Sequence, residues 1–181
     1  MNNLLDKLHN DHKNFSKLLS YAELQLEQIK VFEVIDFETM LYALEYMRDY
    51  SDSVHHPLED IIFKYFLDHY RLSHFEITQL MNEHEEMPQL TEKIINMLQC
   101  IINEAPINRH EFCASLSKYI NFQKQHINHE ESVIYPSIQK NMEEHDWLTL
   151  SMESNMDSDP LFDQPSTQNY QLLLEKLIAT I

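Results

Sequence analysis

The chain has 181 residues, of which 43% are hydrophobic, so its length and composition suit one domain with a substantial core and exclude a disordered chain. The sequence contains no glycine, which excludes glycine-rich phosphate loops and leaves helices as the natural element. Thirteen basic against thirty acidic residues give a net charge of −17 (13 − 30), which argues against nucleic acid as a partner because a phosphate backbone would be repelled.

The first predicted helix covers about residues 3–30. Its core-facing positions alternate three and four residues apart without a break, which is the pattern of a helix that faces a bundle core. These positions are Leu5, Leu8, His12, Phe15, Leu19, Ala22, Leu26 and Ile29. A histidine therefore occupies a core-facing position in this helix.

The second predicted helix starts near Asp36, an acceptable N-cap, and ends near residues 69–72. Its apolar face consists of Met40, Leu44 and Met47, and further on of Ile62 and Phe66. Three residues that can bind metal lie between these two groups, namely His55, His56 and Glu59. Pro57 lacks a backbone donor, so we expect a kink beside them.

The third predicted helix covers about residues 73–103 and the fourth runs from just after Asn108 to about residue 143. In the third helix the core stripe is Ile77, Leu80, His84, Met87, Thr91, Ile94, Leu98 and Ile101, and Pro88 predicts a second kink. In the fourth the stripe is Phe112, Leu116, Tyr119, Gln123, His126, Glu130 and Val133. Polar residues again occupy positions that should face the core.

The last part of the chain has a different composition. Residues 143–167 are rich in Asp, Ser and Pro and predict an irregular segment, which a short amphipathic helix follows. We therefore expect an all-α protein, with an antiparallel up-down-up-down four-helix bundle in residues 1–145. The additional C-terminal helix and the irregular segment, in residues 146–181, should pack on that bundle.

The polar residues in the four core stripes indicate a metal site, because a buried histidine or carboxylate is costly unless it is paired or metal-bound. In an up-down-up-down bundle they all lie roughly 14–25 Å from the same end, at ~1.5 Å per residue, and so share one layer. The spacings His55 to Glu59 and His126 to Glu130 are both i, i+4, which places each pair on one helical face. Two such pairs supply carboxylates that can bridge two metals, and imidazole with carboxylate suits iron, manganese or zinc.

Further histidines complete the set of candidates. The predicted metal ligands are His9, His12, His55, Glu59, His84, His126 and Glu130, with His9 as a fifth histidine at the edge of the first stripe. His56 points about 100° away from His55, so we expect it in an outer layer or in solvent, with Asp60 as its i, i+4 partner. His129 is a weaker candidate, and we expect surface positions for His69, His74, His110 and His145.

Four stretches resemble the hemerythrin-like family, whose bacterial members carry a His-His-Glu cation-binding motif. They are LHNDHKNFSKLL (8–19), HHPLEDIIF (55–63), NEHEEM (82–87) and QHINHEESVIYP (125–136), and the resemblance spans about residues 1–142. It implies a non-haem centre of two iron ions, oxo- or hydroxo-bridged. It also implies metal-ligand roles for His12, for two His-x-x-x-Glu pairs (His55 with Glu59, His126 with Glu130) and for His84.

The third helix departs from the hemerythrin pattern. Hemerythrin has two histidines one turn apart on this helix, whereas Leu80 and Pro88 lie one turn before and after His84. The ligand set of the oxygen carrier is therefore incomplete here. His9 is the candidate that would supply the missing ligand from the first helix.

Three functions fit this centre. The favoured hypothesis is a protein that binds or senses oxygen, nitric oxide or peroxide, because neutral histidine ligands leave less charge to drive oxidative chemistry. The second is an enzyme or iron-handling protein for peroxide or nitric oxide detoxification or iron–sulfur repair, which would link it to oxidative stress. The third is a zinc-binding or metal-free interaction module, whose C-terminal helix contacts a protein partner or a second copy of the chain.

The compartment is expected to be the cytoplasm. The N-terminus lacks the basic and apolar regions of a secretory signal, and no apolar run approaches the ~20 residues of a membrane helix, so no membrane association is expected. Cys100 and Cys113 are the only cysteines, and their spacing matches no redox or zinc motif.

Overall fold

The computed structural model describes residues 3–154 and 157–180, and the regular elements in these residues are all helices. The prediction of an all-helical protein is therefore confirmed. Residues 1–2, 155–156 and 181 belong to the predicted domains 1–145 and 146–181 but lie outside the described residues.

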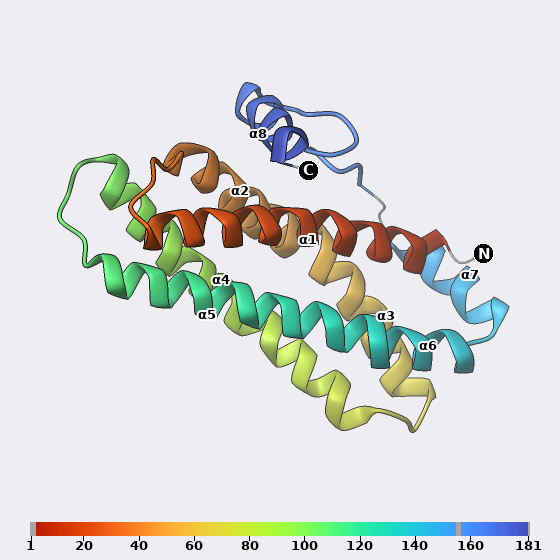
Figure 1. The fold of residues 1–181 in the computed structure, drawn as a ribbon. Coiled ribbons are helices and arrows are strands. Elements are labelled where there is room, and N and C mark those ends of the chain that lie inside the picture. Colours follow the sequence, from red (N-terminus) through yellow and green to blue (C-terminus); the bar gives the residue numbers. More distant parts are fainter. Residues whose placement is uncertain (1–2, 155–156, 181) are drawn as a thin grey trace.

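Four long rods make up most of the fold (Figure 1). The first rod is α1 (Asn3–Lys30) and the third is α4 (His74–Ile102). The second rod consists of α2 (Phe37–Tyr50), a π-helical turn η1 (Ser51–His55) and α3 (His56–His69). The fourth rod consists of α5 (Arg109–His129), a second π-helical turn η2 (Glu130–Ile134) and α6 (Tyr135–Asn141). Consecutive rods run in opposite directions across the view of Figure 1. Helix α1 packs against α2 and α5, and α4 packs against α2, α3 and α5.

Local signals explain where these rods begin. The Asp36 side chain accepts a hydrogen bond from the backbone N–H of Thr39 (3.0 Å) at the start of α2. The Asn108 side chain does the same for Glu111 (3.2 Å) at the start of α5. Each bond satisfies one of the backbone donors that a helix leaves free in its first turn, so both predicted N-terminal boundaries are confirmed.

The apolar core is divided into two clusters. One contains Phe15, Leu19, Met47, Leu98, Leu116 and their neighbours towards the α1–α2 connection, and the other contains Leu8, Ile62, Phe66, Leu80, Ile138 and their neighbours. Along each rod, buried polar residues lie between the members of the two clusters, as His12 does between Leu8 and Phe15. The fold thus brings a polar layer into the middle of the core.

The two π-helical turns are the main local departure from the predicted helices. The first ends at His55, and Pro57, which has no backbone N–H to donate, lies directly after it in the first turn of α3. The second begins at Glu130 and adds a residue per turn, so the core position after Glu130 is Ile134 (0% exposed) and the predicted Val133 is 44% exposed. Turns of this kind are frequent at functional sites. Helix α4 continues through Pro88.

Two further helices follow the rods. Helix α7 (Glu144–Glu153) occupies part of the segment predicted to be irregular, because Glu143 and Asp146 form a reciprocal capping box that starts it. Helix α8 (Gln168–Thr180) packs on α1 and α2. No helix within the described residues is long and apolar enough to cross a membrane.

Candidate metal centre

Six buried residues from all four rods meet in the polar layer between the two apolar clusters. They are His12 from α1, His55 from η1, Glu59 from α3, His84 from α4, His126 from α5 and Glu130 from η2. All six were predicted as metal ligands, and the structure brings them into one cluster.

Glu130 faces rings from three rods. Its Oε2 lies 3.3 Å from His12 Nε2, and its Oε1 lies 3.1 Å from His126 Nε2 and 3.6 Å from His84 Nε2. The two oxygens of one carboxylate therefore face different groups of imidazoles, which is the arrangement that a bridging carboxylate needs.

Glu59 also faces rings from three rods. Its Oε2 lies 3.4 Å from both His55 Nε2 and His84 Nε2, and its Oε1 lies 3.7 Å from His12 Nε2. The Nε2 atoms of His12 and His55 are themselves only 3.1 Å apart. Ring nitrogens that converge in this way leave a position where a cation can be bound.

Each of the four rings has an outer carboxylate on its other nitrogen. The Nδ1 atoms contact Glu131 from His12 (2.8 Å), Asp11 from His55 (3.3 Å), Asp60 from His84 (2.9 Å) and Glu83 from His126 (2.8 Å). Such pairs fix the ring orientation and the tautomer, so that Nε2 is the atom available to a metal, and they raise its basicity. Of these outer carboxylates the sequence pattern pointed only to Asp60, as a partner of His56 and not of His84, because only their contacts distinguish the others from the remaining acidic residues.

The inner atoms lack hydrogen-bond partners. Glu59 Oε2, both carboxylate oxygens of Glu130, and the Nε2 atoms of His84 and His126 are buried and make no hydrogen bond. Unsatisfied buried polar atoms are rare because each costs the full desolvation of its group. Cations between the two carboxylates would satisfy all of these atoms, so the residues present fit a metal centre.

A comparison with protein-family models matches residues 3–138 to the hemerythrin HHE cation-binding domain. The chain belongs to the hemerythrin HHE family. A search of curated proteins finds no match to this sequence. The matched residues include the whole polar layer and end before α7 and α8, so these two helices lie outside the hemerythrin domain.

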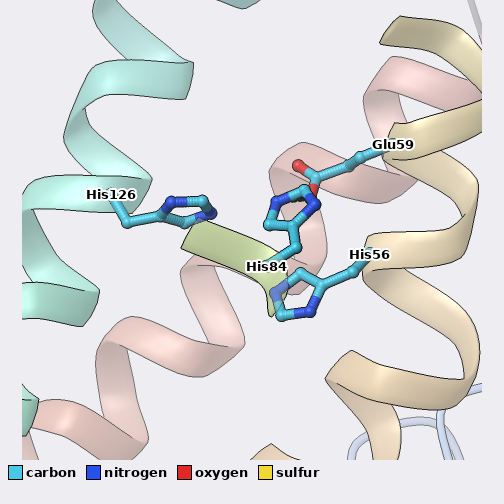
Figure 2. A group of neighbouring side chains, drawn as sticks. All are labelled: His56, Glu59, His84 and His126. Atoms are coloured by element: carbon cyan, nitrogen blue, oxygen red, sulfur yellow. Dashed lines mark ion pairs between the residues drawn. The ribbon is translucent and has the colours of Figure 1, made fainter. Parts of the chain in front are cut away.

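The burial of His56 differs from the prediction that placed it in an outer layer or in solvent. The side chain is buried in the hemerythrin domain and stacks on His84, with ring centroids 4.2 Å apart, and Asp60 contacts His84 instead of His56. Figure 2 shows the side chains of His56 and Glu59 close to those of His84 and His126. The helical offset predicted an outer layer or solvent, and solvent is wrong because this rod has neighbours on two sides, so His55 faces His12 of α1 while His56 faces α4. The sequence signal for this position of His56 was the pair His55–His56 shortly before Glu59.

The potential ligand atoms form two groups that share Glu59. The α1-side group consists of His12, His55 and Glu59, and the α4-side group consists of His56, Glu59, His84 and His126. Within each group the potential ligand atoms are at most 4.8 Å apart. Two groups joined by a carboxylate are consistent with two ions.

His9 lies outside both groups. Its ring is 35% exposed and its Nδ1 lies 2.6 Å from Glu131 Oε2, the carboxylate that also contacts His12. A surface hollow of about 790 Å³ is lined by these three residues. This position suits an outer-layer residue, and the prediction that His9 binds metal directly stays a prediction. His69, His74, His110 and His145 are exposed, as expected, and His129 is partly exposed.

Tyr135 closes the layer on the α6 side. Its hydroxyl donates a hydrogen bond to Glu59 Oε1, and its ring stacks on His12 with centroids 5.4 Å apart. Burial and the charge of Glu59 hold the pKa of Tyr135 well above its usual value. The phenol therefore keeps its proton beside the inner carboxylates.

Without metal, the inner rings and carboxylates form ion pairs. Burial lowers the pKa of these histidines, but nearby carboxylates outweigh it. Glu130 and Glu131 raise the pKa of His12 to about 10. Asp60, Glu130 and Glu59 raise the pKa of His84 to about 10, and Glu130 with Glu83 raises the pKa of His126 to about 9. Although burial opposes it, the charge of the rings lowers the pKa of Glu130 far below its usual range. His56 differs, because burial and the neighbouring rings lower its pKa.

These shifts predict how the stability of the metal-free protein depends on pH. The three raised histidines contribute stability that is fully present below their unfolded pKa of 6.5 and is lost as the pH rises through 9 to 10. The melting temperature of the metal-free protein should therefore fall by more than about 5 °C between pH 6.5 and pH 10. The zinc-loaded protein, whose rings bind metal as neutral groups, is the control and should lack this fall in thermal unfolding. Equal falls in both forms would contradict the proposed pairing.

Proposed function

We propose that this hemerythrin-family protein holds two iron ions in the polar layer and binds a small diatomic molecule or peroxide there. The observation that carries the proposal is the set of buried inner atoms without a hydrogen-bond partner on Glu59, Glu130, His84 and His126. One ion would be held by the α1-side group and the other by the α4-side group, with Glu59 and Glu130 shared. The four rods would form the antiparallel up-down-up-down bundle expected from the sequence.

The donor set supports iron. Imidazole with carboxylate suits iron, while hard ions such as magnesium and calcium prefer an all-oxygen site. A cysteine would favour a soft metal only if its thiolate were a ligand. Cys100 is exposed, and neither cysteine belongs to the two groups. The resemblance to hemerythrin-like proteins adds that such a centre is non-haem diiron.

The surroundings support binding of a small ligand. Bound iron would supply an exchangeable coordination position and redox chemistry. The protein itself holds five imidazoles around two carboxylates and excludes water with aromatic rings: Phe15 lies edge-on to His55 (centroids 4.9 Å apart), Phe63 stacks on His84 (6.2 Å) and Tyr135 covers His12. These large rings leave little room for a bulky substrate. The small volume that remains favours an oxygen, nitric oxide or peroxide ligand.

Metal content and visible absorption test this function. Protein purified from iron-supplemented cells should contain about two irons per chain, as expected for a dinuclear carboxylate site. After reduction, exposure to oxygen should change the visible spectrum, and removal of oxygen should reverse the change. One zinc ion or no metal would contradict the diiron site and would favour a helical interaction module, for which contact of α8 with a partner or a second copy remains the prediction.

The Tyr135–Glu59 contact favours a second function, an enzyme that consumes peroxide or nitric oxide or a protein that donates iron for repair. The phenol holds a proton at its Oη atom next to the inner carboxylate, where a general acid would be needed. Steady-state peroxide consumption that is lost on Glu130→Ala would support this function. A rate equal to that of free iron would exclude it.

A further inference from the structure

The segment after the hemerythrin domain is anchored by a buried carboxylate. Asp159 is 3% exposed, and its Oδ1 accepts hydrogen bonds from the backbone N–H groups of Leu161 and Phe162, both at 2.8 Å. Its Oδ2 accepts from the Tyr46 hydroxyl (2.9 Å) on α2 and from Asn14 Nδ2 (3.3 Å) on α1. One carboxylate oxygen thus fixes the turn that contains it, and the other fixes two side chains of the bundle.

From Tyr46 a continuous path of buried side chains leads to the polar layer. The rings of Tyr46 and Tyr50 stack with centroids 5.4 Å apart, and the Tyr50 hydroxyl donates to Asp11 Oδ1 (3.2 Å). The other oxygen of Asp11 lies 3.3 Å from His55 Nδ1. Phe15 lies edge-on to both tyrosines and to the His55 ring, so the path is supported along its apolar side.

Asp11 differs from the other three outer carboxylates. The side chains of Glu131, Asp60 and Glu83 are 31%, 30% and 19% exposed, whereas that of Asp11 is 2% exposed. Water can stabilise the first three in their orientations, but Asp11 depends on protein donors alone. These donors are Tyr50 and Lys7, whose Nζ lies 2.6 Å from the Tyr50 hydroxyl and 3.4 Å from Asp11 Oδ2. The orientation of the Nδ1 side of the His55 ring thus depends on Asp11 and on the buried groups that hold Asp11.

We propose that Asp159 is a positioning residue for the metal centre, acting on His55 through Tyr46, Tyr50 and Asp11. The C-terminal segment then tunes the α1-side group and leaves the α4-side group unaffected, because His84 and His126 have their own outer carboxylates on α3 and α4. This inference rests on the proposed function in one respect, namely that His55 binds metal.

Cobalt(II) titration of the full-length metal-free protein, followed by visible absorption, tests the inference. The wild type should bind two cobalt ions, and a His55→Ala variant provides the reference spectrum of a protein altered at the α1-side group. Removing an outer partner of a ligand weakens metal binding about 10–100-fold, so Asp159→Ala, which lies three contacts beyond the outer partner Asp11, should weaken that one ion by about 10-fold, the low end of this range. The other ion should keep its affinity within about twofold, since its outer carboxylates are unchanged.

Two further variants separate positioning from stability. Tyr46→Phe keeps the ring stacking and removes only the hydroxyl, so it should weaken the same ion by a smaller factor and should fold if Asp159→Ala does not. Leu177→Ala is the matched control, because Leu177 is a buried side chain of α8 in the core that has no part in the path. It should lower the melting temperature and leave both affinities unchanged.

NMR of the zinc-loaded protein gives a readout independent of affinity. The His55 Nδ1 proton should exchange slowly with solvent in the wild type and in Leu177→Ala, and at least about 10-fold faster in Asp159→Ala, because a loosened hydrogen bond opens more often. Equal weakening of both ions, or the same result from Leu177→Ala and Asp159→Ala, would overturn the inference and leave the two-ion centre intact. A wild type that binds fewer than two cobalt ions would instead overturn the proposed function, and this inference with it.

Discussion

A Glu130→Gln variant is expected to bind at most one metal ion per chain, with an affinity more than about 100-fold below that of the wild type, since even outer-layer changes cost 10–100-fold. The cause is the position of the carboxylate, whose two oxygens face His12 on one side and His84 with His126 on the other. Glutamine keeps the size of the side chain but removes the negative charge that two cations would share. Elemental analysis after equilibration with iron(II) or cobalt(II) measures the loss.

The matched control is Glu131→Gln, one residue along the same π-helical turn. Glu131 contacts the Nδ1 atoms of His9 and His12, whereas Glu130 faces the Nε2 atoms of His12, His84 and His126. It should therefore weaken one ion by about 10–100-fold and leave the stoichiometry at two under saturating metal. Two ions at wild-type affinity in Glu130→Gln would show that this carboxylate is not a shared ligand.

A His56→Ala variant is expected to weaken the ion in the α4-side group by more than about 10-fold, whereas His9→Ala, which removes a contact of the outer carboxylate Glu131, should weaken metal binding by less than about 10-fold, the smallest loss for an outer partner of a ligand. His56 is buried, and its potential ligand atom lies within 4.8 Å of those of Glu59, His84 and His126, while His9 is one-third exposed and contacts Glu131 and the ring of Tyr135. The two histidines thus differ in burial and in the group they can reach. Cobalt(II) titration of both variants measures the difference.

The comparison also decides which residue supplies the fifth imidazole. His56→Gln, which retains bulk against the His84 ring, controls for the loss of packing. If His9→Ala weakens an ion as strongly as His56→Ala, or if His56→Ala binds two ions as tightly as the wild type, the fifth ligand does not come from His56.

The sequence was sufficient to predict the rods and six of the clustered residues. In the first and third helices the three-four alternation is unbroken, and its members are apolar apart from a few residues such as His12 and His84. This has a direct physical meaning, because the same face must pack on a core and a polar residue there needs a partner. The i, i+4 pairs added that each histidine and its glutamate share a face. These inferences depend on local periodicity alone.

The remaining features depend on contacts between rods. A π-helical turn adds one residue to a single turn, and no periodicity shows where it occurs, so the shift from Val133 to Ile134 was not predictable. The orientation of His56 depends on how close α4 lies to α3. Three of the four outer carboxylates were indistinguishable by sequence from the other acids in a chain with thirty of them, and the fourth, Asp60, was assigned to His56 and not to His84. Helix α7 depends on a capping box within a stretch whose composition suggested no helix.

The position of the polar layer between two apolar clusters has a consequence for how the chain survives in a cell. Each cluster packs within its own half of the rods, and the layer between them contains ion pairs and buried atoms without hydrogen bonds unless cations are bound. Metal binding energy is folding energy for such a site, so it determines whether the halves unfold together or separately. A chain without metal is therefore expected to expose one half to proteases more often than a metal-loaded chain does, and, if the metal is iron as proposed, its abundance should follow the iron supply without any change in synthesis.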